Sequence, residues 1–461
     1  MHATRQCGAS RRPSRGGRRA FSLVELLVAS SIALVVMGGI AQLFSIFGRS
    51  FSQSQATVDL AGRLRSTAWQ LRQDLAGTTV DVVPWTQPES NSGYFELIEG
   101  PLRDASYAIA SGAATANLGA DTDDAIFFTT RSAGGPFVGR YDTGTIEAPC
   151  AEVAWFCREA GDQPVAGTTL YNLYRRQLLI VGYAGRPPFY ANGNAAPVGS
   201  LVQASSSGSR PTPIYDLSLR LDGGNAVPNT LGDLTKRENR LFLGGTSSIR
   251  NAAFPYAVLT DGSARLLQTP SLSPTFDSTD RVWEDVILTN VIGFDVRVWD
   301  SQAKAQTTLT PSLYPGDPAY NATAAASGTG ATGAYVDLGW GGGTPAAVGG
   351  TFPPVGQTPL QSAGMKVSNA PGNATLPVAS YDTWSLHYEF NGVDENGNGT
   401  VDERTNAADD NGDDLPDNPP ESETSPPYPV PLRGIEVRIR CYEPTSKQVR
   451  QVTIRHTFIK K

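Results

Sequence analysis

The sequence predicts an α+β protein, in which one long N-terminal helix packs on an antiparallel β-sheet head with large loop insertions. Residues 21–76 carry apolar side chains at helical spacing, first as an uncharged run and then along one face. After Gly77 the apolar pattern changes to a period of two, which is typical of strands. The 461 residues include 48 Gly and 33 Pro, about 18% against roughly 12% in an average protein. This composition favours loops and excludes a compact helical bundle.

The N-terminal end combines a basic leader with an uncharged segment of membrane length. Residues 1–20 contain six arginines and no acidic residue, and residues 26–48 form a run of 23 without a charged side chain. A helix of that length spans about 35 Å, enough to cross a bilayer. Because arginines stay on the cytoplasmic side, we expect a single-pass inner-membrane protein with a cytoplasmic N-terminus and a periplasmic or otherwise extracytoplasmic head.

A cleaved secretory signal peptide is the alternative interpretation of this end. The apolar run is longer than the usual 7–15-residue core of such peptides, and no small-x-small cleavage site follows it. Instead the helical spacing continues on one face up to Gly77, a stop signal. The residues of that face are Leu60, Leu64, Ala68, Leu71 and Leu75. We therefore expect one helix over residues 21–76, transmembrane to about residue 48.

Glu25 is the one charged residue at the start of the apolar run. An ionised carboxylate in lipid costs several kcal/mol unless it has a partner. Glu25 could simply sit at the headgroup interface. Alternatively, a cut before Phe21 would create an α-amine that neutralises Glu25 within the chain or in a neighbouring chain.

Residues 19–28, with the sequence RAFSLVELLV, resemble the leader junction of type IV pilins and pseudopilins. The resemblance implies that a prepilin peptidase cuts between Ala20 and Phe21 and then methylates the Phe21 amine. Glu25 matches the family's glutamate at the fifth mature position, which serves peptidase recognition and assembly register. Ala20 stands where the family nearly always has glycine, so we expect slower cleavage. The implied partners are the peptidase, the inner membrane and other pilin-like subunits in a helical fibre.

The head is expected to be β-rich from residue 77 to 302 and again near the C-terminus. The sequence predicts strands at residues 125–131, 152–158, 170–181, 215–221, 240–243, 291–299, 384–390, 434–442 and 448–458. The last two alternate well and are joined by a hairpin loop at residues 443–447. In the strand at 434–442, Ile435, Val437, Ile439 and Cys441 share one face.

Residues 303–380 are predicted to be a Gly/Pro-rich insertion. They contain 13 Gly, 9 Pro and only four charged side chains, a composition that buries little apolar surface. Residues 335–340 form the one patch within it that could dock on the sheet. Residues 381–461 then form a β-hairpin region.

Three short segments resemble large minor pseudopilins of the type II secretion J type and W-type minor pilins. They are residues 71–75, residues 152–158 with 173–176, and residues 290–296. The chain is about twice the usual size for that group, so its insertions must be large.

The segment from residue 394 to 423 has the composition of a calcium-binding loop. It holds eleven acidic residues and one base, Arg404. Ca²⁺ takes six to eight hard oxygens, and alternate residues of a tight loop point inward. Oxygen ligands fall at positions 1, 3, 5 and 9 of two successive runs. The candidate ligands, with the Thr400 carbonyl at position 7, are Asp394, Asn396, Asn398, Thr400, Asp402, Asp409, Asn411, Asp413 and Asp417.

Both runs depart from the full calcium-loop pattern. In the first, Gly399 fills the turn position but Thr405 replaces the bidentate glutamate at position 12. In the second, Asp414 replaces the turn glycine. The sequence predicts structural Ca²⁺ in this segment, with the first run favoured. The alternative is a solvated acidic loop.

Cysteine and histidine offer little chemistry. Cys150 and Cys157 bracket one strand, about 20 Å apart if extended, and so cannot bridge each other. Cys441 could pair with one of them in an oxidising compartment, or all three could be buried thiols. His387 and His456 are expected to be sheet residues.

The sequence has no catalytic nucleophile, zinc or phosphate-loop motif, so no enzyme is predicted. The acidic head argues against binding of nucleic acid.

The leading hypothesis is therefore a structural minor pseudopilin subunit of a type II secretion or type IV pilus-like fibre. A pilin-anchored periplasmic binding or adhesion module is the alternative. A membrane-anchored periplasmic enzyme is the third hypothesis, and the sequence indicates no catalytic cleft for it.

Overall fold

A computed structural model describes residues 22–82, 90–99, 121–141, 144–160, 169–181, 202–203, 212–213, 216–222, 225–235, 240, 286–307, 313–315, 332–338, 365–366, 377–383 and 431–459. The chain divides into two units, residues 1–57 and residues 58–461.

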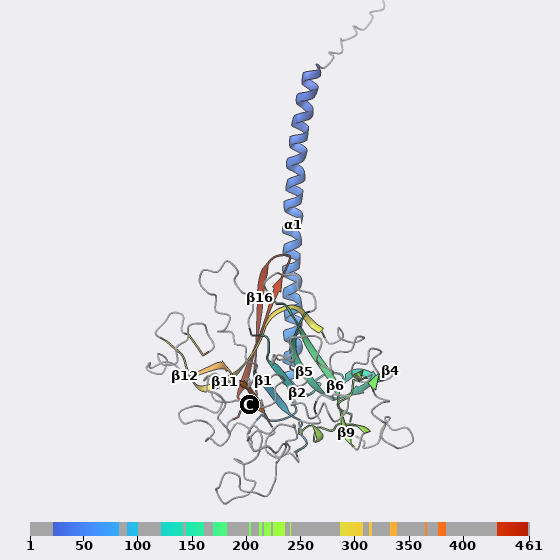
Figure 1. The fold of residues 1–461 in the computed structure, drawn as a ribbon, viewed down its shortest axis with the longest axis vertical. Coiled ribbons are helices and arrows are strands. Elements are labelled where there is room, and N and C mark those ends of the chain that lie inside the picture. Colours follow the sequence, from blue (N-terminus) through green and yellow to red (C-terminus); the bar gives the residue numbers. More distant parts are fainter. Residues whose placement is uncertain are drawn as a thin grey trace, which may run out of the picture. The chain divides into compact units, whose positions relative to one another are not determined.

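Helix α1 (Leu23–Ala76) runs through 54 residues without a break (Figure 1). Residues 22–55 are exposed, and from residue 60 onward one face is buried. The buried apolar residues are Leu60, Leu64, Ala68, Leu71 and Leu75, which confirms the face that the spacing predicts. The helix ends at Gly77, whose amide donates to the carbonyls of Gln73 and Asp74 at 3.2 Å each. A Cβ at Gly77 would collide with the backbone of Arg131, so glycine lets the chain pass close to the sheet.

The main sheet has ten strands, in the order β13–β14–β1–β2–β5–β6–β11–β15–β16, with β12 pairing to β11. All the pairings between these strands are antiparallel, which confirms the α+β fold class. The strands are β1 (Phe95–Glu99), β2 (Ala125–Arg131), β5 (Cys150–Glu159), β6 (Tyr171–Leu179), β11 (Val286–Lys304), β12 (Thr332–Asp337), β13 (Met365–Lys366), β14 (Pro377–Asp382), β15 (Gly434–Glu443) and β16 (Gln448–Thr457).

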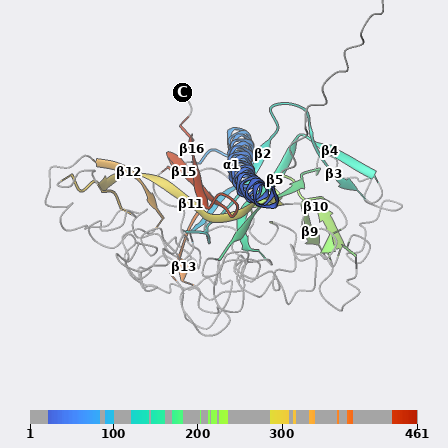
Figure 2. The ribbon, with the colours of Figure 1, turned by 90° about the horizontal axis from the view of Figure 1, so that it is seen from above.

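Three two-stranded sheets, two of which are labelled in Figure 2, and one short 3₁₀ helix complete the described elements. The hairpins are β3 (Phe137–Tyr141) with β4 (Gly144–Ala148), β7 (Val202–Gln203) with β8 (Thr212–Pro213), and β9 (Leu219–Asp222) with β10 (Asn225–Pro228); the 3₁₀ helix is η5 (Asp233–Thr235).

Strand β11 is the longest and changes partner along its length. Its first part pairs with β6, and its second part pairs with β15 on one side and with β12 on the other. The register shifts between Val291 and Gly293, next to Asn290, whose φ is +58°. A bulge of this kind bends a strand and re-aims its side chains. Asp295 and Arg297, just beyond the bulge, are consequently buried.

One hydrophobic core joins the buried face of α1 to the sheet. Trp155 on β5, Phe128 on β2 and Phe294 on β11 are fully buried within it. Phe156 and Tyr174 stack on neighbouring strands with their ring centroids 5.5 Å apart. These aromatic side chains bury large apolar areas, which is the main favourable term for the fold.

A buried ion pair links the last turn of α1 to strands β5 and β6. Arg175 donates to both carboxylate oxygens of Asp74, at 2.7 and 2.8 Å. The indole of Trp155 donates to Asp74 at 3.0 Å, and the Thr130 hydroxyl donates to the Asp74 carbonyl at 2.7 Å. An acidic residue is unfavourable at a helix C-terminus, so this network accounts for the position of Asp74.

Most of the predicted strands are present, with two corrections. The strand predicted at 215–221 is wrong at its start, because Leu217 forms only an isolated bridge with Leu179 and β9 begins at Leu219. Arg240 lies in a bend rather than in a strand. Residues 335–337 of the patch that could dock pair with β11 as part of β12, whereas residues 339–340 lie outside the described residues. Residues 241–243 and 384–390 lie outside the described residues.

The three head cysteines are buried free thiols. Cys150 and Cys157 lie at opposite parts of β5, as the spacing predicts. Burial raises the pKa of the Cys157 thiol, and the nearby Cys441 and Asp124 add to the rise.

Candidate functional site

Ser22 and Glu25 cap the N-terminus of α1 reciprocally. The Ser22 amide donates to Oε2 of Glu25 at 3.0 Å, and the Glu25 amide donates to the Ser22 hydroxyl at 3.1 Å. This arrangement is the capping box of a serine followed three residues later by a glutamate. A carboxylate there is also favoured by the helix dipole. Part of the cost of placing Glu25 beside an apolar run is therefore offset within the chain.

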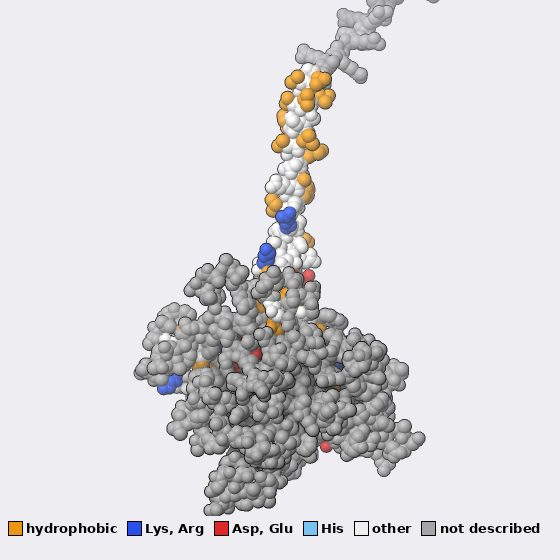
Figure 3. Space-filling model, viewed as in Figure 1, with side chains coloured by type: hydrophobic (Ala, Val, Ile, Leu, Met, Phe, Trp, Pro, Cys, Tyr) orange, Lys and Arg blue, Asp and Glu red, His pale blue; other side chains and the backbone are white. Residues whose placement is uncertain are grey.

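The apolar side chains that follow Glu25 lie on the surface of α1 (Figure 3). Each large apolar side chain from Leu23 to Phe51 is at least 47% exposed. Among the described residues, α1 is the one helix long and apolar enough to cross a membrane. Exposed apolar surface of this extent requires either lipid or other apolar helices around it.

Several predicted site residues fall outside the part of the chain that the structure describes. Ala20 and Phe21, at the predicted cleavage point, are among them. So are all the predicted calcium ligands in the segment 394–423. Glu25 is described, and its contact with Ser22 was missed from the sequence although the Ser-x-x-Glu pattern was present.

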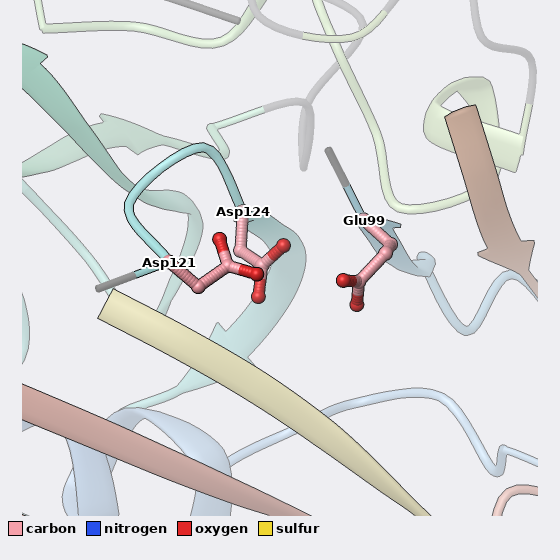
Figure 4. A group of neighbouring side chains, drawn as sticks. All are labelled: Glu99, Asp121 and Asp124. Atoms are coloured by element: carbon pink, nitrogen blue, oxygen red, sulfur yellow. The ribbon is translucent and has the colours of Figure 1, made fainter. Parts of the chain in front are cut away.

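A second candidate site is a cluster of three buried carboxylates in the head (Figure 4). Glu99 is the last residue of β1, and Asp121 and Asp124 lie in the segment that leads into β2. One carboxylate oxygen from each residue lies within 4.8 Å of the other two. All three side chains are about 1% exposed. We refer to Glu99, Asp121 and Asp124 as the carboxylate cluster.

Backbone amides from other elements hold the carboxylate cluster in place. The Val296 amide donates to Oδ2 of Asp124 at 2.6 Å, and the Leu338 amide donates to Oε2 of Glu99 at 3.2 Å. The Phe294 amide donates to the Asp121 carbonyl at 2.7 Å. The bulged strand β11 and the end of β12 therefore fix where the three carboxylates meet.

The electrostatics of this region are strongly negative. Burial raises the pKa of Asp121, and the neighbouring charges of Asp124, Asp123 and Glu99 raise it further. Burial likewise raises the pKa of Asp124. Carboxylate oxygens are hard ligands, which suit divalent cations such as Ca²⁺ or Mg²⁺.

Sequence reasoning missed this cluster. Residues 121–124 read Asp-Thr-Asp-Asp, and this local concentration of acid was a usable signal. Nothing in the sequence around Glu99 indicated that β1 would end beside it, because the approach depends on long-range strand pairing.

Comparison with known proteins identifies the N-terminal part. Residues 15–41 match the family model for the prokaryotic N-terminal methylation motif. No curated protein matches the chain, and no solved structure does. The matched range includes Ala20, Phe21 and Glu25 and enters the apolar part of α1. The chain thus carries the prokaryotic N-terminal methylation motif at the start of a membrane-length helix, which supports a type IV pilin-like protein that is a substrate of prepilin peptidase.

Proposed function

We propose that the protein is a structural minor pseudopilin subunit of a type II secretion or type IV pilus-like fibre. The observation that carries the proposal is the methylation motif at residues 15–41, directly joined to an exposed apolar helix. A chain with this end is held in the inner membrane before assembly. Once assembled, its apolar surface packs on the helices of neighbouring subunits.

The finer assignment, a large J-type or W-type minor subunit, rests on the short resemblances at residues 71–75, 152–158 and 290–296. Asp74 and Arg175 lie within or beside these segments and form the ion pair between α1 and the sheet. A firm junction between helix and head suits a subunit that transmits force along a fibre. We propose a structural rather than an enzymatic role, with Ca²⁺ bound in the segment 394–423.

Processing is tested by expressing the full chain with and without a prepilin peptidase and measuring the intact mass of the product. We expect the peptidase to remove residues 1–20 and to leave an N-methylated Phe21. A product that keeps the leader, or that is cut after the apolar run as a secretory signal would be, contradicts the proposal.

Glu25→Ala is expected to lower assembly into fibres by roughly tenfold or more for each chain that the peptidase has cleaved. A tenfold change corresponds to about 1.4 kcal/mol. An ion pair in lipid between Glu25 and the Phe21 amine of a neighbouring chain stabilises the assembly by more than this amount. Crosslinking of subunits in membranes, scored against the amount of cleaved chain, measures the effect.

Ser22→Ala is the matched control, because it removes the capping hydroxyl and keeps the carboxylate. We expect Ser22→Ala to lose about 1 kcal/mol of helix stability and to assemble at close to the unaltered level. Equal assembly defects in Ser22→Ala and Glu25→Ala would mean that Glu25 acts only as a cap, and the proposed register role would be wrong.

A further inference from the structure

We propose that the open edge of β16 binds an extended acidic segment of another protein by β-strand addition. β16 is the last strand of the main sheet, and among the described strands it pairs with β15 alone (Figure 1). The proposal concerns the head, and it holds whether or not the protein assembles into a fibre.

The first argument is the length and regularity of this edge. Ten residues of β16 pair with β15 without a register shift, and the strand contains no proline or glycine. At the opposite end of the sheet, β13 has only two residues. Native proteins usually shorten, bulge or cover the edges of their sheets, because an open edge is a template for pairing with another chain. β16 is instead long and regular, and seven of its ten residues are exposed.

The second argument is the direction of the backbone groups. The Phe458 amide donates to the Arg433 carbonyl at 3.0 Å, just beyond the end of β16. In an antiparallel ladder, hydrogen-bonded pairs alternate with non-hydrogen-bonded pairs. The amides and carbonyls that point away from β15 therefore belong to residues 449, 451, 453, 455 and 457. These five residues offer both donors and acceptors to an added strand.

The third argument is the character of the two faces beside the edge. Ile454 is fully buried, and Val452 packs against the core. An added strand continues this apolar face, so alternate side chains of the partner are apolar. The other face carries Arg438, Arg440 and Arg455. This face favours acidic side chains at the remaining positions of the partner.

The charge of the hairpin formed by β15 and β16 selects the partner. Residues 433–459 contain six basic and two acidic residues, in a chain whose overall net charge is −7. β16 itself contains Arg450 and Arg455 and no acidic residue. The same edge of a second copy would place two basic strands side by side, and like charges on facing strands are destabilising. The edge therefore suits an acidic strand of a different protein.

The test uses the full-length chain in detergent and two fluorescent peptides as probes. The acidic probe alternates valine and glutamate over about eight residues, which is long enough for a typical strand, and the basic probe alternates valine and lysine. Fluorescence anisotropy measures the binding of each probe. We expect the acidic probe to bind at least about tenfold more tightly than the basic probe. Equal affinity of the two probes would overturn the proposed chemistry of the partner.

Thr453→Pro blocks the edge without removing a hydrogen bond to β15. The Thr453 amide points outward, and proline is tolerated on an edge strand where the missing N–H faces solvent. We expect this variant to melt within about 4 °C of the unaltered chain and to bind the acidic probe at least about tenfold more weakly. Thr453→Ala keeps the amide and is the matched control. Unchanged binding of the acidic probe by Thr453→Pro would overturn the site.

A modified probe tests strand addition without any change to the protein. Successive amides of a strand point to opposite edges, so N-methylation of the valine amides should act differently from N-methylation of the glutamate amides. One of the two modifications should abolish binding, and the other should leave it close to that of the unmodified probe. Equal affinity of the two methylated probes would overturn strand addition. Self-association that Thr453→Pro abolishes, without binding of the acidic probe, would overturn the choice of partner in favour of a second copy.

Discussion

Arg240→Ala is expected to lower the free energy of unfolding of the head by about 3–5 kcal/mol, the usual cost of breaking a buried ion pair from one side. The Arg240 guanidinium is fully buried and lies 2.7 Å from a carboxylate oxygen of both Glu96 and Asp382. Glu96 and Asp382 are directly opposite residues of the neighbouring strands β1 and β14. Without the arginine, two like charges face each other across the pair, which destabilises a sheet.

Arg240 also holds the 3₁₀ helix η5 beside these strands. Its Nε donates to the Leu234 carbonyl at 3.0 Å and its Nη2 donates to the Thr235 carbonyl at 3.2 Å. The guanidinium carbon lies 3.9 Å from the centre of the Tyr94 ring, within the range of a cation–π contact. Alanine removes all of these contacts at once, so the loss extends beyond the two carboxylates.

Urea denaturation of the full chain in detergent, followed by tryptophan fluorescence, measures the change. Adding Glu96→Gln and Asp382→Asn to Arg240→Ala should restore part of the lost stability, because neutral amides no longer repel each other. If Arg240→Ala were within about 1 kcal/mol of the unaltered chain, the buried network would not contribute as described.

Asp74→Ala is expected to cost a similar amount, about 3–5 kcal/mol. It leaves the Arg175 guanidinium buried without the carboxylate at 2.7 Å, and it leaves the buried indole N–H of Trp155 without its acceptor. Each such loss carries the full desolvation cost of the group that remains. The end of α1 should therefore detach from β5 and β6 before the rest of the head unfolds.

Limited proteolysis near residue 76, together with urea denaturation, measures this detachment. Asp59→Ala is the matched control, because Asp59 is an exposed aspartate on the same helix and should change stability by less than about 0.5 kcal/mol. Equal protease sensitivity of the two variants would show that the ion pair does not hold the helix end.

Local periodicity was enough to predict the helix and the strongest strands. The buried face of α1 follows directly from the spacing between Leu60 and Leu75, and β2 has the same bounds as predicted. The alternation in β15 is also confirmed, with Ile435 and Val437 in the core. Glu436, on the opposite face of β15, is nevertheless buried. Its carboxylate oxygens lie 2.7 Å from Nε of Arg438 and 2.6 Å from Nε of Arg455, and these two side chains cover it.

Features that depend on distant pairing could not be predicted. The short strand β1 and the strand β14 have weak local patterns, and each is stabilised by the other. The carboxylate cluster is of the same kind, because Glu99 meets Asp121 only after β1 has paired with β2. A scan for acidic spacing therefore found the segment 394–423, whose pattern is local, and missed a cluster assembled by the sheet.

The pairing of β1 with β14 also constrains how the chain is made. Ile98 pairs with Ser380, so the outer edge of β1 stays open until the residues of β14 have been synthesised. An open strand edge is a template for pairing with other chains, and pairings between distant residues form slowly. We expect newly made chains to need a chaperone during this interval, bound at the sheet edge that β14 later covers.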